Sequence, residues 1–189
     1  MTSDDLGARS DFAHLHDDAL ALLSGWTHPH PQQQALRTAY LDFLSEHPDA
    51  MSRSCRIGHL TSSALLMDED RTRVLLTLHP KVGRWLQLGG HNELGDASVR
   101  EAARREAIEE SGIAEVEISR EPLRLDRHPV PCGGAPSEHL DVQFLTWVPS
   151  DAVAVMSEES DDLRWFAVDD LPTGLDASVK ALIGDALRV

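Results

Sequence analysis

The sequence predicts an α/β fold in which helices cover both sides of a mixed sheet. Apolar residues first recur at helical spacing, up to about residue 54, and then follow the shorter period that is typical of strands. Helical segments at 99–111 and 175–187 interrupt and then end this series of strands. We therefore expect a layered architecture, with an N-terminal helical extension over 1–55 and one domain over 56–189.

The N-terminal extension is predicted to form two helices. Leu15, Ala19 and Leu23 keep helical spacing, the segment 27–31 with its two prolines breaks the pattern, and the apolar residues around Tyr40 resume it. No residue of the extension has chemistry that points to catalysis. We expect it either to cap the sheet or to form the contact of a homodimer.

Short extended segments follow the extension. A hairpin is expected from residues 60–67 and 74–78, joined by a turn at 68–70, and residues 85–88 lead into a glycine pair. Further strands are predicted near 116–119, 123–128, 142–148 and 163–168, with a proline- and glycine-containing loop at 129–138.

The helix predicted over 99–111 has signals at both of its ends. Ser98 and Glu101 have the spacing of a capping box, and Gly112 is typical of a left-handed C-terminal stop. These signals place the last turns of the helix immediately before Gly112.

Three glutamates, Glu106, Glu109 and Glu110, lie on one face of these last turns. The helix dipole disfavours an acidic side chain there by a few tenths to ~1 kcal/mol, and Glu106 and Glu110 repel each other as a like-charged i, i+4 pair. Carboxylate oxygens at this density suit a hard divalent cation such as Mg²⁺ or Mn²⁺. A solvated acidic face balanced by Arg104 and Arg105 is the alternative.

The segment from Gly90 to Ile113 resembles the Nudix box. The pattern of that family ends in Arg-Glu-apolar-x-Glu-Glu-x-Gly-apolar, and residues 105–113 match it at every fixed position. Upstream, Asp96 stands in place of the family's glutamate, and eight residues separate it from Arg105, one more than in the pattern. The resemblance covers roughly residues 58–187 and implies the Nudix α/β/α sandwich with a mixed sheet.

This resemblance implies a metal-dependent pyrophosphohydrolase. Its substrate would be a nucleoside diphosphate linked to another moiety, or a nucleoside triphosphate, cleaved by attack of water at phosphorus. Glu106, Glu109 and Glu110 would hold Mg²⁺ or Mn²⁺, Glu106 or Glu109 would also orient water, and Arg105 would hold a glutamate in place. The alternative is a non-catalytic Nudix module that binds a nucleotide to regulate a partner.

Candidate substrate-binding residues flank the box. Gly89 and Gly90 let a strand end in a tight loop whose backbone lies close to a ligand. Arg84 precedes this loop and could meet phosphates or be exposed surface. Nudix enzymes often use a further glutamate beyond the box, and Glu158 and Glu159 are the best candidates here; a flexible acidic loop is the alternative.

Three histidines and an aspartate form a candidate second metal site. His59 opens the first strand, His91 follows the glycine pair, and His139 and Asp141 open a later strand with both side chains on one face. These positions are similar to the metal site of type I isopentenyl diphosphate isomerase, a Nudix relative with Glu-x-Glu in place of His-x-Asp. Isomerase activity is not expected, because Gly89 stands where that enzyme has a reactive cysteine. The alternative is that the histidines line the substrate cleft or lie at strand ends.

Charge and composition narrow the class of protein further. The chain has 32 acidic and 17 basic residues, and its net charge of −15 argues against nucleic acid or an anionic membrane as a partner. Its two cysteines lack CxxC spacing, and its first residues lack the basic and apolar regions of a secretory signal. We expect a cytoplasmic enzyme that acts on a small nucleotide-type substrate.

Overall fold

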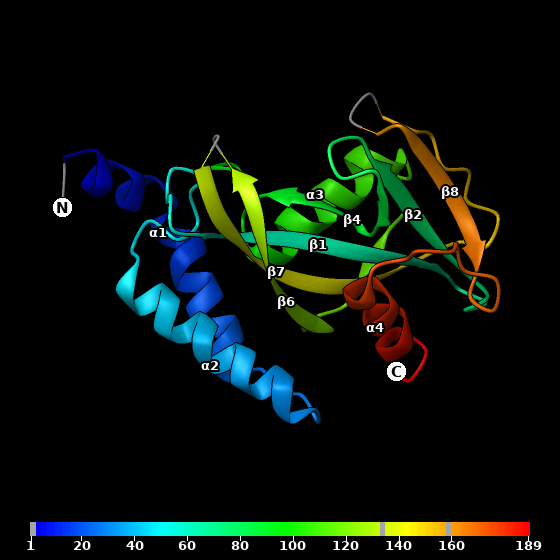
Figure 1. Ribbon diagram of the computed structural model, residues 1–189, viewed down its shortest axis with the longest axis horizontal. Helices are drawn as coiled ribbons and strands as arrows, with labels where there is room; N and C mark the ends of the chain where they lie inside the picture. The colour runs from blue at the N-terminus through cyan, green and yellow to red at the C-terminus, as the bar shows by residue number, and fades with distance from the viewer. Residues whose placement is uncertain (1–2, 133–134, 158–159) are drawn as a thin grey trace. The chain divides into compact units, whose positions relative to one another are not determined.

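The computed structural model describes residues 3–132, 135–157 and 160–189. Figure 1 shows the course of the chain through its helices and strands. The helices are α1 (Ser3–Gly25), α2 (Pro31–Glu46), α3 (Val99–Ser111) and α4 (Ala177–Ala186). The strands are β1 (His59–Asp68), β2 (Arg73–His79), β3 (Arg84–Leu86), β4 (Leu88–His91), β5 (Glu117–Ile118), β6 (Arg124–Cys132), β7 (Ala135–Val148) and β8 (Asp162–Ala167). Within these residues, no helix is long and apolar enough to cross a membrane.

The strands form one mixed sheet, which confirms the predicted α/β architecture. The order along the sheet is β3-β2-β1-β7-β5, while β4 pairs with β1, β6 with β7, and β8 with β2. The expected hairpin is present: β1 and β2 are antiparallel, with Leu66 opposite Leu75. Strands β1 and β7 run in the same direction (Figure 1). At the hairpin turn the Asp68 carboxylate accepts hydrogen bonds from the backbone N–H groups of Thr72 and Arg73, at 2.7 and 2.9 Å.

The chain folds into two compact units. The first contains residues 1–62, 91–102 and 124–142, and the second contains residues 63–90, 103–123 and 143–189. Strands β1, β4 and β7 and helix α3 contribute residues to both units.

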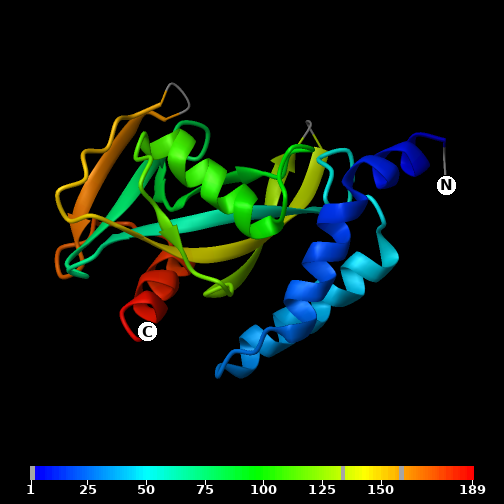
Figure 2. The same ribbon diagram turned by 180° about the vertical axis from the view of Figure 1, so that it is seen from behind.

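In the first unit, the N-terminal helices are attached to strands by hydrogen bonds. Helices α1 and α2 lie side by side, as Figures 1 and 2 show, and Pro31 begins α2 at the position where its missing N–H costs nothing. The Gln33 side chain donates to the Leu125 carbonyl at 3.0 Å and accepts from the Leu125 N–H at 2.7 Å. The Tyr40 hydroxyl lies 2.7 Å from the Asp126 carbonyl oxygen and 3.1 Å from that of Asp141.

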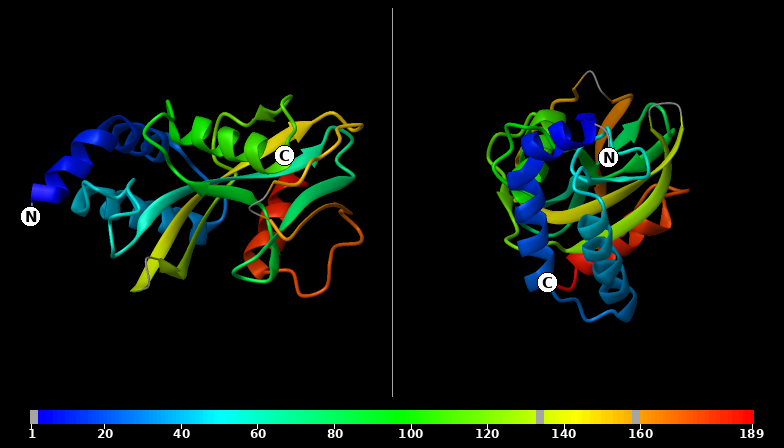
Figure 3. Two further views of the ribbon diagram at one scale, coloured as in Figure 1. Left: turned by 90° about the horizontal axis from the view of Figure 1, so that it is seen from above. Right: turned by 90° about the vertical axis from the view of Figure 1, so that its left-hand side faces the viewer.

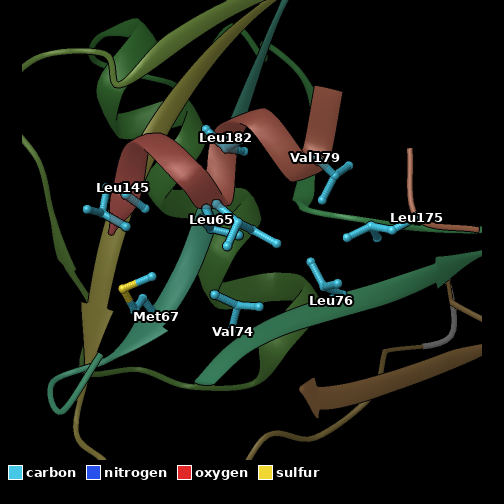
Figure 4. Close-up of a cluster of buried hydrophobic side chains, with 10 residues drawn as sticks. Leu65, Met67, Val74, Leu76, Leu145, Leu175, Val179 and Leu182 are labelled. Carbon is cyan, nitrogen blue, oxygen red and sulfur yellow. The ribbon is translucent and has the colours of Figure 1, made fainter. Parts of the chain in front are cut away.

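In the second unit, strand alternation supplies two separate apolar faces. Leu65 and Met67 of β1 pack with Val179 and Leu182 of α4 in one cluster, which Figure 4 shows in close-up. The intervening residues Ala64 and Leu66 belong to a second cluster, which contains Ala107 of α3. Because successive side chains of a strand point to opposite faces, α3 and α4 cover opposite faces of β1 (Figure 3).

The loop predicted at residues 129–138 is wrong. Strand β6 continues to Cys132 and β7 begins at Ala135, so most of this segment is extended. The prediction of a loop depends on the prolines and glycines of this segment. In the described part of the sheet β6 pairs with β7 alone, and an edge strand tolerates prolines because its outer N–H groups have no ladder partner.

Candidate active site

Helix α3 begins and ends where its sequence predicts. The Ser98 hydroxyl accepts a hydrogen bond from the Glu101 N–H at 3.1 Å, as expected for a cap. The Asp18 carboxylate of α1 accepts from the Val99 N–H at 2.8 Å, a second cap that no local pattern could predict. At the other end Gly112 has a φ of 67°, the left-handed conformation of a C-terminal stop.

Arg105 connects two of the three glutamates of α3. One of its guanidinium nitrogens donates to Glu106 and to Glu109, at 2.9 Å in each case. The Arg105 side chain is 20% exposed and that of Glu109 is 57% exposed. The arginine thus keeps the buried carboxylate and the exposed carboxylate in one orientation, in the way that the resemblance implies for an arginine at this position.

The Glu106 carboxylate occupies the space above Gly90. Glu106 is only 8% exposed. A Cβ atom added to Gly90 would lie 2.6 Å from a Glu106 carboxylate oxygen and 2.8 Å from its carboxyl carbon, closer than real side chains approach. The absence of a side chain at Gly90 therefore makes room for this carboxylate against β4.

Glu110 and Asp96 differ in their surroundings. Glu110 is half-buried and lies one residue after Glu109, in the last turn of α3. Asp96 is 6% exposed, and its carboxylate accepts a hydrogen bond from the Glu93 N–H at 2.7 Å. The carbonyl oxygen of Asp96 also lies 2.8 Å from a ring nitrogen of His14 in α1. Asp96 therefore organises the loop before α3 within the first unit.

The candidate substrate-binding residues divide into three groups. Gly89 lies in β4 beside Gly90. Arg84 lies in β3 and forms a 3.1 Å ion pair with Asp176, the residue that caps the N-terminus of α4. Glu158 and Glu159 lie outside the described residues.

The structure brings together the three histidines of the predicted second metal site, all within the first unit. The ring centroids of His59 and His91 are 5.0 Å apart, those of His59 and His139 are 4.9 Å apart, and those of His91 and His139 are 5.2 Å apart. One potential ligand atom from each ring lies within 4.8 Å of the other two. Asp141 is buried, and its carboxylate accepts a hydrogen bond from the Thr61 hydroxyl at 3.0 Å.

Burial favours the neutral form of two of these imidazoles, those of His139 and His59. It lowers the pKa of His139 to about 3, with further contributions from His59, His91 and His128 in that order. Burial also lowers the pKa of His59. Neutral imidazole is the form that binds metal ions, because protonation occupies the ligating lone pair.

A second group with potential ligand atoms was not predicted. His47, Asp49 and Cys55 lie within 4.8 Å of one another in the first unit, in and after the turn that follows α2. Burial, followed by the charge of Asp49, raises the pKa of the Cys55 thiol to about 11. Since the thiolate is the form that binds metals, this group is a weaker metal ligand than the three histidines. The only sequence signal for this group is that its three residues lie within nine positions of one another.

The ligand chemistry of the glutamates fits a hard divalent cation. Glu106, Glu109 and Glu110 supply carboxylate oxygens, and Arg105 pairs with the first two of them. The glycine cradle at Gly90 fixes the buried carboxylate while Glu109 remains open to solvent. Mg²⁺ and Mn²⁺ prefer such oxygen ligands and retain part of their hydration.

Solved structures with the same fold include several from one family. A NUDIX-family hydrolase from Clostridium perfringens is 24% identical, with a TM-score of 0.57 over 69% of this chain and 96% of that chain. A C. elegans Ap4A hydrolase in a binary complex is 17% identical, with a TM-score of 0.55 over 68% and 95% of the two chains. The NUDIX domain of Shewanella oneidensis NrtR, complexed with ADP ribose, is 20% identical, with a TM-score of 0.53 over 72% and 91%. No curated protein sequence matches this chain significantly.

The family itself is identified from the sequence profile. The NUDIX domain profile matches residues 58–184, which include all of β1, the glycine pair, α3 and the histidine cluster. Because this match spans more than half of the chain, the protein belongs to the Nudix family.

Proposed function

We propose that this Nudix hydrolase is a metal-dependent pyrophosphohydrolase that cleaves a nucleoside diphosphate linked to another moiety, or a nucleoside triphosphate, by attack of water at phosphorus. The observation that supports this most directly is the pairing of Arg105 with Glu106 and Glu109, beside the Gly90 cradle. A helix designed only for stability would carry basic residues in its last turn, and α3 has none there.

The residues of α3 have separable roles in this proposal. Glu106, Glu109 and Glu110 would hold Mg²⁺ or Mn²⁺, and the cation would supply positive charge to the phosphoryl oxygens. Arg105 keeps the carboxylates of Glu106 and Glu109 oriented. Glu109 is the more exposed of these two, and it is therefore the better placed to orient an attacking water from solvent.

The substrate class is supported by what similar structures bind. One of them is an Ap4A hydrolase, and another is complexed with ADP ribose. Both molecules are nucleotides with a phosphoanhydride bond, which is the bond that we propose this protein cleaves. We propose that Gly89, Gly90, Arg84 and Glu159 contribute to binding such a substrate.

The domain organisation and the cellular compartment of the enzyme are part of the same proposal. We propose a catalytic domain over 56–189 with a helical extension over 1–55, acting in a reducing compartment such as the cytoplasm. A free, buried Cys55 and the lack of CxxC spacing are consistent with that compartment.

An assay across substrates and metals tests the proposed reaction. Nucleoside diphosphate derivatives and nucleoside triphosphates are incubated with Mg²⁺ or Mn²⁺, and phosphate and pyrophosphate products are measured. We expect turnover with one class of substrate, loss of turnover in EDTA, and recovery when the divalent ion is restored.

Isotope labelling then identifies the atom that is attacked. In ¹⁸O-labelled water, attack at phosphorus places the label in a phosphate product. Label found only in a non-phosphate product, or turnover that persists in excess chelator, would contradict the proposal. Calorimetric binding of a nucleotide with no turnover across the panel would support the regulatory module instead.

A further inference from the structure

The histidine cluster of the first unit consists of His59, His91 and His139. These residues come from β1, from the end of β4 and from β7, so they are far apart in the sequence. Their ring centroids are 4.9 to 5.2 Å apart, and a ligand atom of each ring lies within 4.8 Å of the other two. Three imidazoles rarely converge for packing alone, because an apolar side chain fills the same space without burying polar nitrogens.

The ring nitrogens of two of these histidines are poorly satisfied. His59 is 1% exposed, and neither of its ring nitrogens has a hydrogen-bond partner of normal geometry among the described residues. The nearby Cys55 backbone favours the protonated form of His59, but the effect of burial on its pKa is larger. The Nε2 atom of His139 is likewise buried with no hydrogen-bond partner among those residues. A buried nitrogen left in this state is unfavourable, and a ligand that accepts its lone pair would offset that cost.

Neighbouring residues fix the strands that carry His59 and His139. Thr61 lies two residues after His59 on β1, and Asp141 lies two residues after His139 on β7. The hydrogen bond between Thr61 and Asp141 therefore fixes the two strands next to the contact between the two histidines. The Tyr40 hydroxyl contacts the backbone carbonyl of Asp141, which ties the same strand to α2. Such outer contacts restrict the orientations that metal ligands can adopt.

From this geometry we propose that His59, His91 and His139 bind a transition-metal ion, with Zn²⁺ as the reference ion, at a site distinct from the carboxylates of α3. Three imidazole nitrogens suit borderline ions such as Zn²⁺, whereas Mg²⁺ and Mn²⁺ prefer oxygen. In a tetrahedral Zn²⁺ site the ligating nitrogens are ~3.3 Å apart, so binding draws the three rings together by at most ~1.5 Å. Three protein ligands leave a fourth position for water or for an oxygen of a ligand.

Asp141 and His128 lie beside this site but are not among its three proposed ligands. The Asp141 carboxylate accepts from Thr61, and the proposal therefore gives it a positioning role. The His128 ring is 5.6 Å from that of His139, and its Nδ1 is 2.8 Å from the Asp126 carboxylate. His128 is therefore a matched control: a histidine of the same neighbourhood that the proposal does not use as a ligand.

Metal titration of the full-length protein tests this site without any activity measurement. Protein stripped with chelator is titrated with Zn²⁺ by calorimetry and with Co²⁺ by visible absorption, which reports the ligand set. We expect one tight Zn²⁺ per chain in the wild type. Affinity should fall on the order of 100-fold or more in His59→Ala and His139→Ala.

Three control variants separate this site from the alternatives. Binding should be unchanged in His128→Ala, in Cys55→Ser, which alters the group of His47, Asp49 and Cys55, and in Glu109→Gln. Loss of the tight site in Cys55→Ser or Glu109→Gln, or no tight Zn²⁺ in the wild type, would overturn the proposal. If a histidine variant does not fold, the wild-type Co²⁺ complex decides: X-ray absorption showing imidazole ligands supports the site, and oxygen or sulfur ligands alone contradict it.

Discussion

The glutamates of α3 and the histidines of the first unit offer metal ions two opposite environments. Glu109 presents a charged oxygen with its side chain 57% exposed, whereas His59 presents neutral nitrogens and is 1% exposed. Oxygen ligands that remain open to water suit ions that keep part of their hydration, and buried nitrogens suit ions that give it up. The type and burial of the ligand atoms, and not the total negative charge of the chain, therefore determine which ion each cluster can select.

The largest expected effect is that of Glu109→Gln. If this carboxylate orients water or holds the cation, turnover should fall about 10²- to 10⁴-fold. The melting temperature in metal-free buffer should be nearly unchanged, because the lost pair with Arg105 is exposed and contributes only ~0–1 kcal/mol. Steady-state kinetics and thermal unfolding measure the two effects. A variant that loses fold and activity together would point to a structural role for the acidic face.

Gly90→Ala tests the glycine cradle. The added methyl group would lie 2.6 Å from a Glu106 oxygen, so the carboxylate must move. A displacement of ~1 Å in a catalytic group can cost on the order of 10²-fold in rate, and we expect kcat to fall by 10- to 100-fold. The matched control is Gly95→Ala, because a Cβ atom at Gly95 meets no atom within 4 Å. Equal losses in both variants would exclude a specific role for Gly90.

Arg84→Ala measures whether this arginine meets phosphate. A lost charge-assisted hydrogen bond of ~1.5 kcal/mol corresponds to a roughly 10-fold rise in KM. The control is Asp176→Asn, which also breaks the Arg84–Asp176 ion pair but leaves an N-cap residue at α4. A rise in KM in both variants, or in neither, would contradict a direct contact between Arg84 and the substrate.

Acid should destabilise the fold through the buried histidine cluster. The unfolded chain takes up a proton at His139 near pH 6.5, whereas the folded chain does so only near pH 3. Between these values the unfolded state binds more protons, so stability present at neutral pH is lost as the pH falls through this window. Urea unfolding from pH 7 to pH 4.5 should show this loss, to which His139 alone contributes at most ~1.4 kcal/mol per pH unit. His139→Gln should flatten the slope, and an unchanged slope would contradict the assignment.

The parts of the fold that sequence patterns predict are those with local causes. Ser98 and Gly112 define the ends of α3, because capping and the left-handed turn depend on neighbouring residues alone. The extended segment around Pro129 was mistaken for a loop, since the tolerance of a strand for proline depends on which strands pair beside it. Edge position is a property of the sheet and not of the segment.

The candidate sites show the same difference between features with local causes and features that depend on the whole fold. The glutamates share one helical face, so their spacing alone predicts that they lie together. Strand period places His139 and Asp141 on one face, but only the structure shows that Asp141 contacts Thr61 while His139 joins His59 and His91. The cap that Asp18 provides to α3 joins segments far apart in the chain, and no periodicity of either segment indicates it.

The hydrogen bonds of Gln33 and Tyr40 have a consequence for the dynamics of β6. The Leu125 amide is buried and donates to the Gln33 side chain, so its hydrogen exchange depends on opening of α2 and not only on separation of the strands. Cutting the chain at residue 58, where the family profile begins, would leave this amide and the carbonyls of Leu125, Asp126 and Asp141 without these partners. The hydrogen-exchange rate of the Leu125 amide therefore reports whether α2 remains docked on β6.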